Sequence, residues 1–143
     1  MIAVDTNILV SAHREDSPWH GKAKRKVTKL ANSGKPWAIT WPSVHEFLAI
    51  VTHPKIYDPP TPMPTALAAI KAWQGSPNLR FLGEGPGYFE KISTLATNGM
   101  IRGPKIHDAR IAAICIHHGV KKLWTADRNF SSFPELSCEN PLV

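Results

Sequence analysis

Apolar residues fall into two kinds of segment along this chain: short runs bounded by polar or turn residues, and longer stretches with helical spacing. The short runs predict strands at residues 2–4, 37–41, 79–82 and 120–125, with another near 137–139. The longer stretches predict helices at residues 8–12, 19–31, 43–51, 66–73, 88–97 and 107–118. Because strands alternate with helices, we expect an α/β fold: a three-layer sandwich with a central, mostly parallel sheet.

Local signals predict where some of these elements begin. Ser17 followed by Pro18 predicts the start of the second helix, as an N-cap with proline at the first helical position. Ser43 and Glu46 have the spacing of a capping box, in which each side chain accepts the backbone N–H of the other residue. Prolines crowd the segment 53–64, which predicts a loop with little regular structure.

Length and composition predict an ordinary globular protein. The 143 residues suggest one domain, residues 1–143, and 43% are hydrophobic while 20% are charged. Cys115 and Cys138 have no metal-binding spacing, so we expect free thiols. The sequence shows no signal-like segment and no apolar run of membrane-spanning length, so we expect a cytoplasmic protein without membrane contact.

The balance of charge makes the acidic residues informative. The formal net charge is +6, which favours attraction to polyanions, and only 11 residues are Asp or Glu. Four of these acids stand beside apolar runs: Asp5, Glu46, Asp108 and Asp127. Each has a plain structural alternative, which is a turn or N-cap for Asp5 and Asp127, a capping box for Glu46, and the helix dipole for Asp108.

The four acids share a position that these alternatives do not explain. All lie at the carboxyl end of a predicted strand or the amino end of a predicted helix, and in a parallel α/β sandwich those ends share one edge. Carboxylates crowded at one edge repel unless a cation lies between them. Oxygen ligands without a His or Cys cluster suit Mg²⁺ or Mn²⁺, and such a cation in a basic protein points to phosphodiester chemistry.

Three segments together resemble a PIN-domain nuclease: Val4-Asp5-Thr6-Asn7-Ile8-Leu9, His107-Asp108-Ala109-Arg110-Ile111-Ala112, and Thr125-Ala126-Asp127-Arg128-Asn129-Phe130. With a helical Glu46, their order and the chain length look most like VapC, the toxin of type II toxin–antitoxin pairs. The resemblance implies a Mg²⁺- or Mn²⁺-dependent endoribonuclease.

The resemblance also implies roles for particular residues. The catalytic quartet would be Asp5, Glu46, Asp108 and Asp127, and the metal ligands would be Asp5, Asp108 and Asp127. Thr6, Asn7 and Thr125 would support the site. Many members of the family carry a further acid where this chain has Asn129, which adds no charge to a second metal site.

Partners follow from the same resemblance. It implies an RNA substrate, a cognate antitoxin and a homodimer. Arg110 and Arg128 are the basic residues nearest in sequence to the acids, so we expect them to contact RNA. Trp19, Trp37 and Trp73 are candidates for a dimer or antitoxin surface.

Two other functions remain open from the sequence. A haloacid-dehalogenase-like phosphatase also has an Asp after its first strand, but it uses Asp-x-Asp and here the third position is Asn7. A non-catalytic RNA-binding module of the same fold would not need all four acids. The glycine-rich segment 83–87 lacks the lysine of a phosphate-binding loop and predicts a turn.

Overall fold

The computed structural model describes all 143 residues. Five strands form one parallel sheet in the order β3-β2-β1-β4-β5: β1 (Ile2–Val4), β2 (Trp37–Thr40), β3 (Leu79–Leu82), β4 (Lys122–Trp124) and β5 (Ser137–Glu139). The helices are α1 (Thr6–His13), α2 (His20–Ala31), α3 (Trp41–Val51), α4 (Met63–Gln74), α5 (Tyr88–Asn98) and α6 (Ile106–His117). There are also two 3₁₀ turns: η1 (Gly103–Lys105) directly precedes α6, and η2 (Arg128–Ser132) lies between β4 and β5.

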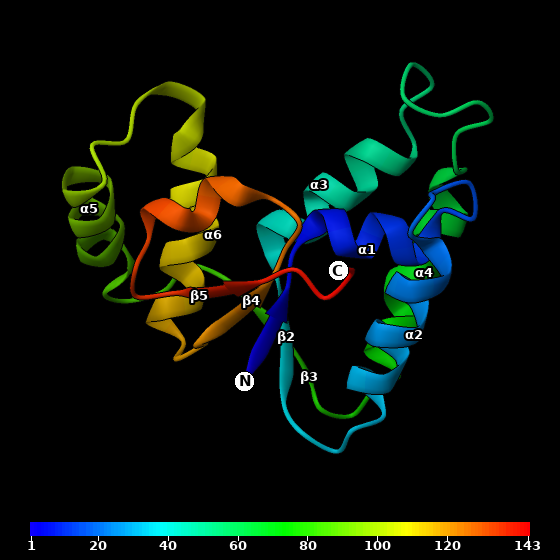
Figure 1. Cartoon of the computed structure of the whole chain (residues 1–143), viewed down its shortest axis with the longest axis horizontal. Coiled ribbons are helices and arrows are strands. Elements are labelled where there is room, and N and C mark those ends of the chain that lie inside the picture. Colours follow the sequence, from blue (N-terminus) through cyan, green and yellow to red (C-terminus); the bar gives the residue numbers. More distant parts are fainter.

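The helices cover both faces of the sheet, so the predicted three-layer sandwich is confirmed. In Figure 1, α5 and α6 lie on one side of the strands, and α2 and α4 on the other. Each face has its own core of buried apolar side chains. Ile111, Ile114 and Leu123 belong to the core under α6, and Val27, Ile39 and Phe47 belong to the core under α1 to α4.

Several element starts differ from the sequence prediction: α1 begins at Thr6 and not at residue 8, β4 begins at Lys122 and not at residue 120, and three further starts have a local cause. The second helix begins at His20, because the Ser17 hydroxyl accepts the N–H of Trp19 in a local turn and caps no helix. Strand β2 ends at Thr40, one residue early, and α3 starts at once with Pro42 in its first turn. Proline also fits the first turn of α4, so that helix begins at Met63, inside the predicted loop.

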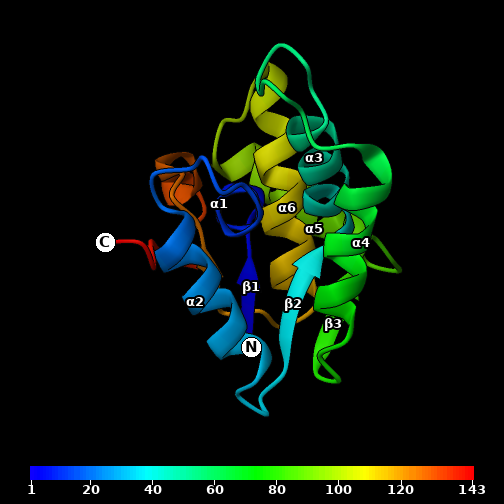
Figure 2. The same cartoon turned by 90° about the vertical axis from the view of Figure 1, so that its right-hand side faces the viewer.

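The strand order places one special position in the sheet. Strands β2 and β3 extend from one side of β1, and β4 and β5 extend from the other. The order in which strands are added to the sheet therefore reverses between the parallel neighbours β1 and β4, where Val4 pairs with Trp124. Figure 2 shows β1 and β2 pointing toward the end of the sheet where α1 and α3 lie. Ligand sites of open α/β sheets form at such a carboxyl edge, beside the switch in strand order.

No helix has both the length and the apolar character needed to cross a membrane.

Candidate active site

Asp5 lies at the switch point, directly after β1. Its backbone N–H donates to the Trp124 carbonyl at 2.9 Å, which joins it to the end of β4. The residue is 4% exposed and is the N-cap of α1, with Oδ1 accepting the Thr6 N–H at 2.8 Å. The N-cap interpretation is therefore right, and it leaves room for a second role because Oδ2 faces other partners.

The Thr125 hydroxyl ties the two central strand ends together. It donates to Asp5 Oδ2 at 2.8 Å and accepts the Asp127 N–H at 2.9 Å and the Asn7 Nδ2–H at 3.2 Å. A hydroxyl has one proton and two acceptor lone pairs, so Thr125 is fully used. Asn7 closes the network, because its Oδ1 accepts the Ala126 N–H at 3.0 Å. Asn7 and Thr125 therefore lie in one hydrogen-bond network with Asp5, and their predicted roles near a metal or its waters stay a prediction.

Glu46 joins this network through Thr6. The Thr6 hydroxyl donates to Glu46 Oε2 at 2.9 Å, across 40 residues of sequence. The predicted capping box of Ser43 and Glu46 is wrong. Thr40 is the N-cap and accepts the Ser43 N–H, because Pro42 shifts the helix start toward the N-terminus by three residues. Glu46 is therefore free to extend toward the carboxyl edge of the sheet.

Asp127 and Asp108 complete the acidic group from the other face. Asp127 caps η2, with Oδ1 accepting the Asn129 N–H at 2.8 Å. Asn129 thus meets Asp127 through its backbone, and its side chain makes no hydrogen bond there. Asp108 is half-buried in the first turn of α6, and no hydrogen bond holds its carboxylate.

Burial and mutual repulsion disfavour the charged forms of two acids. Burial raises the pKa of Asp5 from 3.8 to about 6, and the charges of Glu46 and Asp127 add to this against the hydrogen bonds of Thr125 and Thr6. The pKa of Asp108 is also raised, first by burial and then by Asp127 and Glu46. Glu46 and Asp127 therefore lie within electrostatic reach of both Asp5 and Asp108.

The donor set fits a hard divalent cation. It consists of oxygen atoms, and the pKa values of Asp5 and Asp108 are raised first by burial and then by neighbouring carboxylates, a cost of ionisation that such a cation would relieve. No three His, Cys, Asp or Glu side chains converge as a ready-made metal site. Asp5, Asp108 and Asp127 as direct ligands therefore stay a prediction.

The raised pKa of Asp5 predicts a stability gain for Asp5→Asn when no metal is present. Because the folded pKa of about 6 exceeds the usual 3.8, ionisation destabilises the fold as pH rises through this window, and the full cost persists above it. That cost is about 3 kcal/mol. The amide mismatches one of the saturated donors around Asp5, at about 1 kcal/mol. In EDTA at pH 7.5, the Tm of Asp5→Asn should exceed that of the wild type by about 5 °C.

Thermal melts across pH supply the control for that prediction. The advantage of Asp5→Asn should shrink as pH falls from about 6 toward 4, because the wild-type carboxyl then takes up its proton. A variant that is less stable than the wild type across this whole range would contradict the assigned pKa.

The two predicted RNA-binding arginines differ in their surroundings. Arg110 forms an ion pair through Nε with Glu84, which lies in the turn after β3. Arg128 is exposed at the start of η2 and forms no ion pair. Sequence reasoning missed Glu84, because a glycine-rich turn carries no signal for a partner 26 residues away. It also assigned Ser43 to a cap, although its buried hydroxyl lies 3.5 Å from Asp5 Oδ1.

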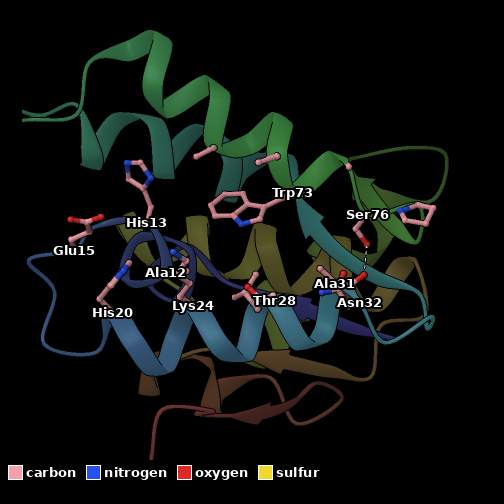
Figure 3. A pocket seen from close by; sticks show the side chains of 15 residues that line it. Ala12, His13, Glu15, His20, Lys24, Thr28, Ala31, Asn32, Trp73 and Ser76 are labelled. Atoms are coloured by element: carbon pink, nitrogen blue, oxygen red, sulfur yellow. Dashed lines mark hydrogen bonds between the residues drawn. The ribbon is translucent and has the colours of Figure 1, made fainter.

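A separate cavity of about 600 Å³ lies between α2 and α4, away from the four acids. Figure 3 shows Trp73 from α4 and Thr28 and Lys24 from α2 around it, with His13 and His20 at one end. Three tryptophans were candidates for a partner surface, and the prediction is wrong for Trp37, which is completely buried in the core. Its indole N–H instead donates to the Ser76 hydroxyl at 3.0 Å.

Comparisons with known proteins agree with this geometry. Residues 2–136 match the PIN domain family. Ribonuclease VapC48 of Mycobacterium tuberculosis is 32% identical over 138 residues, which span 96% of this chain and 94% of the relative. Ribonuclease VapC43 of the same organism is 30% identical over 142 residues, spanning 99% and 96%.

Solved structures share the fold at lower identity. VapC20 of Mycobacterium tuberculosis, described as a Sarcin-Ricin loop cleaving toxin, has a TM-score of 0.66 at 19% identity and covers 92% of this chain and 94% of its own. VapBC2 from Rickettsia felis, bound to a DNA fragment from their promoter, has a TM-score of 0.66 at 21% identity, covering 97% and 98%. Together with the family match, these relatives show that the chain belongs to the PIN-domain family, as a ribonuclease of the VapC type.

Proposed function

We propose that this chain cleaves RNA phosphodiester bonds with Mg²⁺ or Mn²⁺ held by Asp5, Asp108 and Asp127. One observation carries the proposal: Asp5 and Asp127 share the Thr125 hydroxyl at the switch point between β1 and β4. The hydroxyl bonds the carboxylate of Asp5 and the backbone N–H of Asp127, so two strand ends far apart in the sequence are tied together at the point where both acids lie. Such an arrangement costs stability without a cation, and a cation site at a carboxyl edge is its chemical use.

The residues of the chain have distinct tasks in this proposal. A bound divalent cation would activate water and offset charge on the phosphate. The Thr6 hydroxyl holds Glu46 by Oε2, which leaves Oε1 to orient the attacking water. The Thr125 hydroxyl donates its single proton to Asp5 Oδ2 and so holds the Asp5 carboxylate in one orientation. Asn7 braces both strand ends, and this use of its amide gives no support to a phosphatase of the haloacid-dehalogenase type.

A cleavage assay tests the proposed metal requirement. Purified protein is incubated with transfer RNA and ribosomal RNA at pH 7.5, in Mg²⁺, Mn²⁺ or EDTA. We expect defined fragments in either metal and intact RNA in EDTA. Cleavage that persists in EDTA would contradict the proposal, and RNA binding without cleavage in either metal would favour the non-catalytic module.

We also propose a cognate antitoxin as the protein partner of this chain. The VapC-type relatives and the structural similarity to VapBC2 support it. Homodimerisation and an RNA substrate complete the proposed partners. Co-expression with the product of a small open reading frame next to this gene, followed by co-purification, tests the antitoxin: a stable complex that suppresses RNA cleavage is expected, and a complex without suppression would contradict it.

A further inference from the structure

Three aromatic rings stack on the surface at the carboxyl ends of β2 and β3. Trp41, the first residue of α3, stacks on Phe81 with ring centroids 4.8 Å apart and planes at 23°. His45 stacks on Trp41 at 6.4 Å and 29°. The Trp41 ring also lies close to the Gly83 backbone, where a Cβ would come within 3.3 Å of it. Although held on these sides, Trp41 is 41% exposed and His45 is exposed.

A fixed guanidinium lies beside this stack. Arg110 pairs with Glu84 through Nε alone, so its two terminal NH₂ groups have no hydrogen-bond partner in the protein. The Arg110 side chain is 40% exposed. Both Arg110 and His45 act on Glu84, because the hydrogen bond of Arg110 and then the nearby charges of Arg110 and His45 lower its pKa. Because Glu84 follows Gly83, whose backbone lies against Trp41, and Trp41 stacks on His45, these contacts place His45, Glu84 and Arg110 in one cluster.

The cluster shares its helices with the catalytic acids. In α3, His45 directly precedes Glu46, and in α6, Arg110 follows Asp108 by two residues. The aromatic stack thus borders the carboxylates on the β2–β3 side of the sheet edge. The proposed mechanism uses none of Trp41, His45, Phe81 or Arg110.

We infer that Trp41, His45 and Arg110 form a nucleotide subsite beside the carboxylates, which takes an unpaired RNA base on the aromatic stack and a backbone phosphate on Arg110. The inference rests on the ribonuclease function proposed above. Exposed aromatic rings stack on bases of single-stranded segments, and guanidinium groups bind phosphate in a forked geometry. Glu84 is a positioning residue here, because it fixes Arg110 while leaving both NH₂ groups for the phosphate.

RNA is a better occupant for this surface than an apolar protein segment. The stack includes the imidazole of His45 and is bordered by the cationic Arg110, and the chain carries a net charge of +6. A strand of RNA that reaches the carboxylates must also cross the adjacent surface of α3 and α6. A second copy of this chain would instead place two like-charged surfaces together.

The base-stacking role is tested by equilibrium binding, in EDTA, of a fluorescent RNA hairpin with a single-stranded loop. All chains carry Asp5→Asn, so no RNA is cleaved and the result is independent of the metal requirement. Trp41→Leu should weaken binding by about tenfold, as expected for the loss of one stacked base. Phe89→Leu is the control, since Phe89 is an aromatic residue of α5 that is 76% exposed and has no assigned role, and it should leave affinity within about twofold.

The role of Glu84 is tested by the sign of its effect. If Glu84 were only a surface acid, Glu84→Ala would strengthen RNA binding by removing repulsion, as we expect for the unpaired exposed acid Glu90 in Glu90→Ala. As the residue that positions Arg110, it should weaken binding when removed, by about threefold or more. In the Arg110→Gln background the Glu84→Ala loss should vanish, because coupled residues are not additive.

Two results would overturn the inference. One is an affinity of Trp41→Leu equal to that of Phe89→Leu in chains with equal thermal melts. The other is a shift of Trp41→Leu from dimer to monomer with unchanged RNA affinity per chain, which would make the stack a subunit interface.

With Asp5 intact, Trp41→Leu should raise KM for RNA in Mg²⁺ with little change in kcat. Failure of the wild type to cleave RNA would count against the proposed function alone.

Discussion

Replacing Asp5 by asparagine is expected to lower the rate of RNA cleavage in saturating Mg²⁺ by about a thousandfold or more. The amide keeps the size of the side chain but removes the negative charge at the switch point between β1 and β4. Electrostatic groups placed at a reaction centre contribute effects of this order, and here the charge also serves to hold the cation. Initial rates on a defined RNA substrate measure the effect.

The same variant separates function from folding. Asp5→Asn is expected to be more stable than the wild type without metal, so a loss of cleavage cannot come from unfolding. Asp58→Asn is a matched control, because Asp58 is an exposed acid in the loop before α4. It should cleave at the wild-type rate. A loss of less than tenfold for Asp5→Asn would show that Asp5 has no direct part in catalysis.

Thr125→Val should weaken the metal site through the supporting hydroxyl alone. Valine matches the shape of threonine but leaves Asp5 Oδ2, the Asp127 N–H and the Asn7 amide without their shared partner. Loss of such a supporting group costs about 10- to 100-fold in metal affinity or activity. The unfolding free energy should also fall by about 1–3 kcal/mol, because buried polar groups lose their partner.

Thr125→Ser distinguishes the hydroxyl from the rest of the side chain. Serine restores the donor and both acceptor lone pairs, so Mg²⁺ affinity and cleavage should return to within a few-fold of the wild type. Calorimetric titration and initial rates on both variants make the comparison. If valine and serine behave alike, the hydroxyl does not organise the site.

Most of the fold could be predicted from the sequence, because the apolar runs are short and well separated. Every predicted strand and helix exists, and the ends moved by a few residues where proline entered a first helical turn, as in α3 and α4. Proline at such a position is read from sequence as a break, although its missing N–H costs nothing there.

The candidate site was predictable as far as it depends on strand ends. Asp5 and Asp127 each follow a central strand, so parallel pairing alone predicts that they meet. The contacts that fix them were not predictable, because Thr125 and Thr6 act across 120 and 40 residues of sequence. The roles of Glu84 and Trp41 were not predictable for the same reason. An acid in a turn and an exposed aromatic residue show a role only through the neighbours that the fold places beside them.

The burial of Trp37 shows a related limit. A tryptophan in a short strand can face a partner or the core, and period-two spacing over four residues does not decide between them. The parallel sheet is covered on both faces, which buries all four residues of β2. The central position of β2 in the sheet, between β1 and β3, therefore determines where Trp37 lies.

The central claim is that the four carboxylates form one divalent-cation site. The most direct test is a calorimetric titration of the wild type with Mn²⁺ and Mg²⁺ at pH 7.5, beside Asp5→Asn, Asp108→Asn and Asp127→Asn. Saturable binding to the wild type that weakens at least tenfold in each variant is the predicted result. Binding isotherms that are the same for the wild type and all three variants, or no binding to the wild type, would contradict it.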